Sequence, residues 1–386
     1  MDWTKSGTHA AAIAVAAFLA LPASAQQGVS GDKVVFGQAA VFDGPAAALG
    51  KGMNLGIRAA FEEQNKAGGV KGRKLDLVAK DDGYEPDRSV TAVNELLDQA
   101  KVFALIGPVG TPTASATQPI ATQKEVPFIG AFTGAGFLRN PQLANVINVR
   151  ASYGQETEAW IKHLTEDRKA QKIAILYQDD SFGQAGLSGV KAAMDKRGMK
   201  LAAEGTFKRN TVAVKTALLE IRKANPDAVV MVGPYKPCAE FIKLAKQVGM
   251  KSAFVNISFV GADALAAELG PEGDGVIVSQ VVPFPQDTKI PVVARYHAAL
   301  KAIDAQAKPG FISLEGYLVG RMAIMALEKV EGAPTRKSFL DAIYKAGKFD
   351  LGGMTLQFGP GDNQGSDQVF MTIIQADGSF KAVDKL

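Results

Sequence analysis

The sequence of 386 residues has little of the chemistry that most enzymes use. It contains one cysteine, Cys238, and three histidines, of which His163 and His297 stand in segments with helical periodicity, far from any Ser or Asp motif. A lone cysteine forms no intramolecular disulfide. The chain also lacks a GxSxG elbow, a Walker loop and closely spaced His and Cys residues. We therefore expect a protein that is not an enzyme and that holds no cofactor and no metal.

Two further ligand classes are disfavoured by missing features. The glycines at 134 and 136 do not complete a dinucleotide-binding fingerprint, because Arg139 stands at the position of the third glycine. The net charge of +4 is spread along the chain, and its densest basic cluster, at 71–74, has no interleaved aromatic residues. We expect neither a nucleotide cofactor nor a nucleic-acid partner.

Long apolar runs are absent except for one at the N-terminus. Residues 10–21 carry no charge and are followed by Pro22 and by Ala-Ser-Ala at 23–25, which is typical of a cleaved signal peptide and too short to span a bilayer. No cysteine follows that would anchor a lipid. The sequence therefore predicts a signal peptide at 1–25 and a soluble, monomeric protein in the periplasm of a Gram-negative cell.

The rest of the chain alternates short apolar runs with segments of helical periodicity. A run at 33–39 precedes a helical stripe that includes Met53, Ile57 and Phe61, and a half-buried run follows at 74–80. The same alternation restarts beyond Arg150. Repeated βα units imply parallel sheets covered by helices. Two series of them predict an α/β protein with two similar lobes.

Small and hydroxyl residues follow two neighbouring apolar runs, 102–106 and 126–129. Because loops at the carboxyl ends of parallel strands bind ligands, and helix N-termini there attract anions, we expect these loops to hold the acidic end of a small molecule. The threonines have an alternative interpretation as helix N-caps, and the glycines as residues that permit a turn. The loop residues are Gly110, Thr111, Thr113, Phe132, Thr133 and Gly134.

Eight short motifs, in this order and spacing, resemble the solute-binding proteins of branched-chain amino-acid ABC transporters. They are DGP at 43–45, NKAGGVKG at 65–72, DD at 81–82, IGP at 106–108, VPFI at 126–129, KIAIL at 172–176, FG at 182–183 and PDA at 226–228. The resemblance covers nearly all of the chain after residue 25. It implies the type I periplasmic-binding fold, in which two Rossmann-like lobes with parallel central sheets are joined by a multi-strand hinge.

The resemblance also implies a division of the chain and a function. The first lobe is expected to comprise 32–150 and 283–348, and the second 151–282 and 349–386. The two lobes would close on a small carboxylate-bearing ligand, with an amino acid as the first candidate, and deliver it to an ABC permease in the inner membrane. A ligand-sensing subunit for a membrane receptor is the alternative role.

Carried over by position, the resemblance assigns ligand-binding roles to several residues and shows that the acid expected to pair with a ligand ammonium is absent. Thr111 takes the place of a carboxylate-binding serine, and Ser258 stands where leucine-binding relatives have the acid that pairs with the ligand ammonium. Asp180, Glu156 or Glu240 could replace it. Otherwise the ligand is an amine-free aromatic or aliphatic carboxylic acid. The residues expected to complete the site are Gly110, Thr113, Phe132, Thr133, Gly134, Tyr153, Phe182 and Tyr235.

Overall fold

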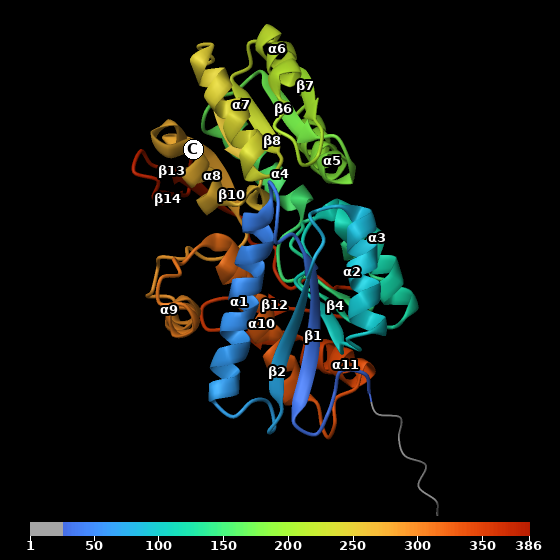
Figure 1. Cartoon of the computed structure of the whole chain (residues 1–386). Coiled ribbons are helices and arrows are strands. Elements are labelled where there is room, and N and C mark those ends of the chain that lie inside the picture. Colours follow the sequence, from blue (N-terminus) through green and yellow to red (C-terminus); the bar gives the residue numbers. More distant parts are fainter. Residues whose placement is uncertain (1–25) are drawn as a thin grey trace, which may run out of the picture.

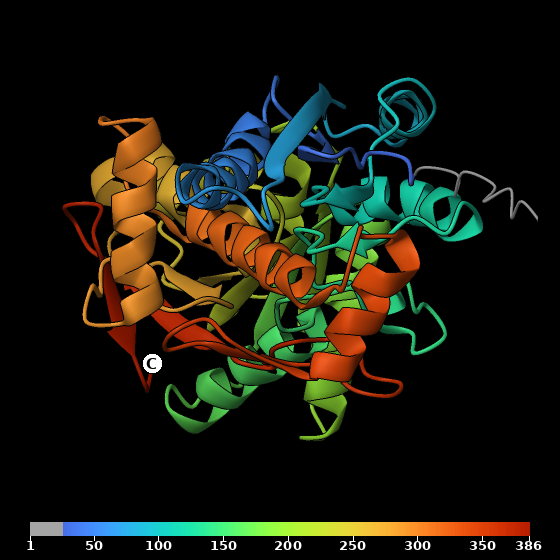
Figure 2. The same cartoon turned by 90° about the horizontal axis from the view of Figure 1, so that it is seen from below.

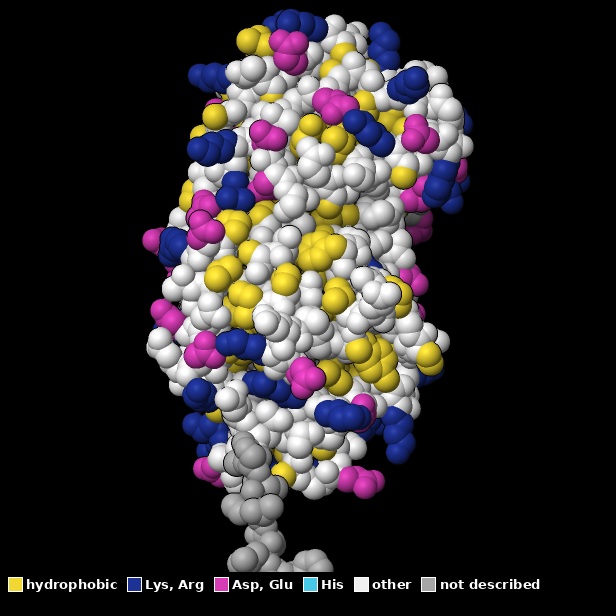
Figure 3. All heavy atoms as spheres, turned by 90° about the vertical axis from the view of Figure 1, so that its right-hand side faces the viewer, with side chains coloured by type: hydrophobic (Ala, Val, Ile, Leu, Met, Phe, Trp, Pro, Cys, Tyr) yellow, Lys and Arg dark blue, Asp and Glu magenta, His cyan; other side chains and the backbone are white. Residues whose placement is uncertain are grey.

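The computed structural model describes residues 26–386, so the signal peptide predicted at 1–25 lies outside the described residues. The described chain forms two lobes, each built around its own sheet and stacked end to end in Figure 1. No helix in this part of the chain is long and apolar enough to cross a membrane. On the face shown in Figure 3, charged side chains of both signs are interspersed.

The first lobe contains a five-stranded parallel sheet in the order β2-β1-β3-β4-β5. Its order places β3 and β4, the two strands that precede the predicted binding loops, next to each other. Its strands are β1 (Lys33–Ala40), β2 (Lys74–Asp81), β3 (Ala104–Ile106), β4 (Phe128–Ile129) and β5 (Val146–Ile147), and its first helices are α1 (Ala47–Lys66), α2 (Pro86–Asp98) and α3 (Thr111–Gln123).

The second lobe contains a seven-stranded sheet in the order β14-β13-β10-β9-β8-β6-β7. Its pairings are parallel from β7 to β10, whereas β13 and β14 add an antiparallel edge. Its strands are β6 (Ile173–Gln178), β7 (Ala203–Phe207), β8 (Ala228–Val232), β9 (Ala253–Asn256), β10 (Ile277–Gln280), β13 (Phe370–Ile374) and β14 (Phe380–Val383). Its helices are α4 (Tyr153–Glu166), α5 (Ser181–Asp195), α6 (Lys215–Lys223), α7 (Tyr235–Gln247) and α8 (Ala262–Leu269).

Three late helices return the chain to the first lobe. Helix α10 (Phe311–Lys329) lies against α1 along most of its length, between α9 (Pro291–Ile303) and α11 (Arg336–Ala346), as Figures 1 and 2 show. The backbones touch, because a Cβ at Gly56 would lie 1.9 Å from the carbonyl oxygen of Ser313 and one at Gly316 would lie 2.3 Å from that of Met53. Helix α10 is therefore held rigidly in the core.

The chain passes between the sheets at three places. The connections follow β5, β10 and the hairpin of β11 (Lys348–Asp350) and β12 (Thr355–Gln357), and a bridge from Asn148 to Gln364 joins two of them. Several parallel connections of this kind form a hinge. The boundary residues of the lobes at 150, 282 and 348 stay a prediction.

Candidate functional site

The loops after β3 and β4 meet and join their hydroxyl groups. Residues Val109 and Phe132 form a β-bridge, which brings the Oγ1 atoms of Thr111 and Thr133 to 2.7 Å from each other. The hydroxyl of Thr133 in turn lies 3.2 Å from the Oη of Tyr153, at the start of α4 in the second lobe. All three hydroxyls are buried. They form a short chain of groups that can donate to an anion from both lobes.

The alternative interpretation of the threonines as N-caps is wrong. Gly110 occupies the N-cap position of α3 with φ +106°, and it provides no side-chain cap. The hydroxyl of Thr113 donates to the carbonyl of Val109, and that of Thr111 faces Thr133. The N–H groups of the first helical turn are therefore left without a capping side chain, and such groups favour a negative charge.

Two glycines of these loops make room for tyrosine rings. A Cβ at Gly134 would lie 2.5 Å from the ring of Tyr153, and one at Gly110 would lie 2.3 Å from the ring of Tyr84. Gly134 has no positive φ, so its role is close approach and not the backbone freedom offered as the alternative. At Gly136, by contrast, a Cβ would meet nothing within 4 Å.

Aromatic rings from both lobes close around the hydroxyl groups. The ring of Phe259 lies 5.2 Å from that of Phe132 in the first lobe and 4.6 Å from that of Phe182 in the second. Phe182 is also 5.5 Å from Tyr153, and Tyr84 is 6.0 Å from Phe259. The site therefore combines a polar end with an apolar, aromatic wall, as small-molecule sites generally do.

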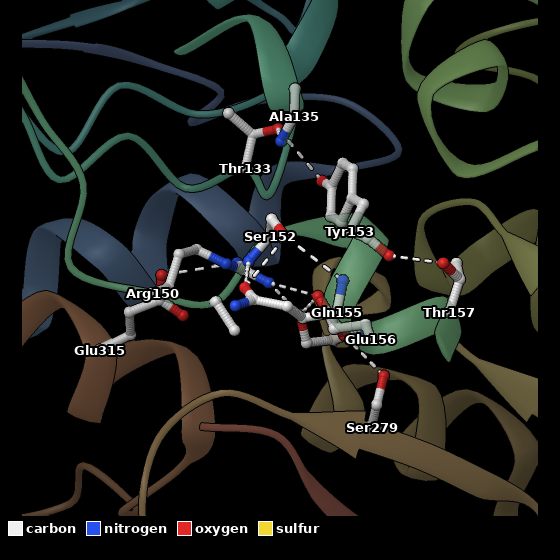
Figure 4. A network of polar contacts seen from close by, with 12 residues as sticks. Thr133, Ala135, Arg150, Ser152, Tyr153, Gln155, Glu156, Thr157, Ser279 and Glu315 are labelled. Carbon is white, nitrogen blue, oxygen red and sulfur yellow. Dashed lines mark hydrogen bonds and ion pairs between the residues drawn. The ribbon is translucent and has the colours of Figure 1, made fainter. Parts of the chain in front are cut away.

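A buried ionic network lies beside this wall. Arg150, on the connection that leaves β5, pairs through Nη2 with Glu156 at 3.1 Å and through Nη1 with Glu315 of α10 at 3.4 Å (Figure 4). Its guanidinium carbon is 5.2 Å from the ring centroid of Phe132 and 5.9 Å from that of Tyr153. The network therefore joins both lobes and the hinge behind the aromatic wall.

The carboxylate of Glu156 reaches the position of the missing acid. One oxygen accepts from the Oγ of Ser258 at 2.9 Å, and the other accepts from the backbone N–H of Ser258 at 2.9 Å and from the Oγ of Ser279 at 2.5 Å. The Oγ of Ser258 also accepts from Arg150. Ser258 therefore connects a carboxylate and a guanidinium that lie next to it in space.

The second carboxyl of the network, that of Glu315, has a raised pKa. Burial raises the pKa of Glu315 to about 7, although the nearby guanidinium of Arg150 lowers it and the carboxylate of Glu156 raises it further. For Arg150, burial lowers the pKa, but the two carboxylates more than offset this and raise it. Arg150 is therefore charged at every physiological pH, whereas Glu315 changes charge near pH 7.

Two expected site residues lie apart from this centre. The hydroxyl of Tyr235 accepts from the backbone N–H of Ala48, at 3.4 Å, where α7 meets α1 across the lobes. The hydroxyl of Thr113 faces its own loop. The other eight belong to the three contacting hydroxyls, to the aromatic wall and the loops beside it, or to the surroundings of the ionic network. They are Gly110, Thr111, Phe132, Thr133, Gly134, Tyr153, Phe182 and Ser258.

The sequence analysis missed Tyr84, Arg150 and Glu315. A signal was present for the two charged residues, because Arg150 comes three residues after the end of the apolar strand β5 and Glu315 interrupts a strongly apolar helix. A lone charge in such a segment needs a buried partner. Within the described part of the chain, no group of three or more His, Cys, Asp or Glu side chains is arranged to hold a metal ion.

Comparison with known protein families agrees with this architecture. The model of a periplasmic binding protein family matches residues 33–379, which is most of the chain. The chain belongs to the periplasmic binding protein family. Members of this family are substrate-binding transport proteins, and the two-lobed α/β structure described above is their type I fold.

Several periplasmic binding proteins are similar over most of the chain. A crystal structure of a possible leucine/isoleucine/valine-binding protein from Rhodopirellula baltica is 39% identical, with a TM-score of 0.87, covering 91% of this chain and 96% of that one. The Leu/Ile/Val-binding protein homolog 7 of Brucella suis is 25% identical over 89% of this chain and 88% of its own. A leucine-, isoleucine-, valine-, threonine- and alanine-binding protein of Pseudomonas aeruginosa is 25% identical over 74% and 76%.

Proposed function

We propose that this protein is the periplasmic solute-binding component of an ABC importer and that it binds a small carboxylate between its lobes. The observation that carries the proposal is the set of three hydroxyls, those of Thr111, Thr133 and Tyr153, that contact one another beside the N-terminus of α3. Buried hydroxyls and uncapped N–H groups stabilise an anion, and the adjoining aromatic wall suits an apolar body.

Closure of the lobes follows from the division of this site. The solute first contacts Thr111 and Thr133 on the first lobe, and Tyr153 and Phe182 of the second lobe then cover it. A ligand shifts a conformational equilibrium only through its different affinities for the two states. Here only the closed state offers contacts from both lobes, and that closed shape is what an inner-membrane ABC permease would recognise.

The names of the similar proteins put amino acids first among the carboxylates to be tested. An amine-free aromatic or aliphatic acid is the second candidate, and the aromatic wall of Phe132, Phe182 and Phe259 supports it. We propose a monomer that performs no catalysis and is exported by its signal peptide. Presentation of the solute to a membrane receptor, in place of a permease, is the alternative role.

A thermal-shift screen tests the proposal. The purified protein without residues 1–25 is heated with amino acids, with aromatic and aliphatic carboxylates, and with sugars and nucleosides as controls. A ligand at about 100 times its Kd adds roughly 2.7 kcal/mol to the free energy of unfolding, which raises the melting temperature by several degrees. If only a sugar or nucleoside raises it, the carboxylate site is refuted.

A further inference from the structure

Arg150 lies next to two of the residues that form the proposed carboxylate site, Phe132 and Tyr153. It lies on the connection from β5 to α4, next to the aromatic wall, and its side chain is fully buried. Its guanidinium lies against the rings of Phe132 and Tyr153, which also line the proposed carboxylate site. The network around Arg150 therefore borders the proposed carboxylate site.

The carboxylate of Glu156 has no place for a ligand ammonium. A carboxylate offers about four acceptor positions. One oxygen of Glu156 accepts from Arg150 Nη2 at 3.1 Å and from Ser258 Oγ at 2.9 Å. The other accepts from the N–H of Ser258 and from the hydroxyl of Ser279. All four positions are filled by the protein itself.

Glu315 is a poor substitute for Glu156 as the partner of a ligand ammonium. Its carboxyl faces Arg150 at 3.4 Å, with Glu156 and Arg139 as the other charged groups that act on it. A carboxyl with a pKa of about 7 is half protonated at neutral pH, and the protonated form has no negative charge to offset that of an ammonium. An ammonium would also add a second positive charge beside a buried guanidinium.

Arg150 itself needs an acceptor. Its Nε is buried, and no residue of the described chain accepts a hydrogen bond from it. A buried donor without a partner is destabilising, and an acceptor oxygen on a solute would remove that deficit. An ammonium, which only donates, would not.

We propose that the solute is a carboxylate without a free ammonium group, such as a 2-oxo acid or an unsubstituted acid with an apolar body, and that Arg150 sets this selectivity. This inference rests on the proposed carboxylate site and narrows its ligand class. Arg150 neutralises the carboxylate that an ammonium would need, and it presents its Nε to an acceptor oxygen of the solute.

Calorimetric titration with acids matched in their carbon chain tests the inference. One set is leucine, 4-methyl-2-oxopentanoate and 4-methylpentanoate, and a second is phenylalanine, phenylpyruvate and 3-phenylpropanoate. We expect an amine-free acid of one set to bind at least about tenfold more tightly than its amino acid, because a buried ammonium without a partner is costly. An amino acid that binds as tightly as, or more tightly than, its amine-free partners overturns the inference and leaves the carboxylate site standing. If no acid of either set or of the wider screen binds, the proposed function fails first.

The variant Arg150→Lys tests the role of the guanidinium. Lysine keeps the positive charge but has no Nε donor in a planar fork. We expect the affinity for the best amine-free acid to fall at least about fivefold, while Arg197→Lys, which alters an Arg–Glu pair on the surface of the second lobe, leaves it unchanged. Equal affinities in Arg150→Lys and the wild type would refute the contact. Circular dichroism verifies that both variants are folded.

Discussion

Arg209 of the second lobe and Glu85 of the first form an ion pair of 2.9 Å that joins the two lobes. The same guanidinium binds Asp180 at 2.9 Å, and the neighbouring Asn210 donates to the carbonyl of Gly83 and to Glu85. Because these contacts need no solute, they stabilise the closed arrangement by themselves. The lobes are therefore held together by a latch, defined by Glu85, Arg209 and Asn210, that is separate from the binding residues.

Replacing Arg209 by alanine should release this latch. Both partners are partly exposed, so we expect a loss of about 0.2–1 kcal/mol in closure, which is less than about a sixfold increase in Kd. The radius of gyration of the ligand-free protein, measured by X-ray scattering, should increase. The control is Lys223→Ala, which removes an exposed pair with Glu220 within α6. An unchanged radius in Arg209→Ala would show that the pair does not hold the lobes.

Gly134→Ala should weaken binding without unfolding the protein. The added methyl group would lie 2.5 Å from the ring of Tyr153 and displace it from Thr133. Overpacking of this kind costs about 1–3 kcal/mol. Gly136→Ala is the matched control, since its methyl group meets nothing within 4 Å. Calorimetry should report a weaker solute affinity only for Gly134→Ala, and equal affinities would place the tyrosine outside the site.

Substitutions at Thr111 and Thr113 should have different effects, the first on solute affinity and the second on stability. Thr111→Val removes a hydroxyl that faces Thr133, and the loss of a hydrogen bond to a charged carboxylate should cost about 1.5–3 kcal/mol, or roughly 10- to 150-fold in Kd. Thr113→Val removes a hydroxyl that bonds its own loop, so it should lower the melting temperature and change the affinity little. The reverse pattern would mean that Thr113 is the ligand contact.

Glu315 should make stability depend on pH. Burial raises its pKa to about 7 in the folded protein, whereas an unfolded glutamate titrates near 4.3. The folded state therefore binds the proton more tightly, and this contribution, on the order of 3 kcal/mol, is fully present below about pH 4.3 and is lost as the pH rises through 7.

The measurement is the difference in melting temperature between the wild type and Glu315→Gln at each pH. Glutamine has no titratable group, so the difference cancels the other buried acids, including Asp82 and Asp263, whose pKa values burial raises to about 6. The melting temperature of the wild type should fall relative to that of Glu315→Gln as the pH rises from 4.5 to 7.5. A difference that is constant with pH would show that Glu315 keeps an ordinary pKa.

Much of the fold could be predicted from the sequence because its signals are local. The apolar runs at 33–39 and 74–80 correspond to β1 and β2, each of which extends one residue further. Alternation of such units is sufficient to imply parallel sheets. The antiparallel edge of β13 and β14 is not encoded in that alternation, because it depends on where the last strands dock.

The site could be predicted only in part, because its polar contacts join distant segments. Thr133 and Tyr153 follow β4 and β5, which are consecutive strands and also neighbours in the first sheet. The contact between Glu156 and Ser258 spans 102 positions and joins two segments of the second lobe, α4 and the turn after β9. Position 258 taken alone therefore indicated a missing acid, whereas in space the carboxylate comes from another helix.

The place of Arg150 on the hinge has a kinetic consequence. Arg150 stands on a connection between the lobes, so we expect its pairing with Glu315 of the first lobe to change less on opening than the contacts of Arg209, which joins the lobes directly. A solute would then meet the guanidinium before the lobes close. We therefore expect changes at Arg209 to act mainly on the residence time of the solute.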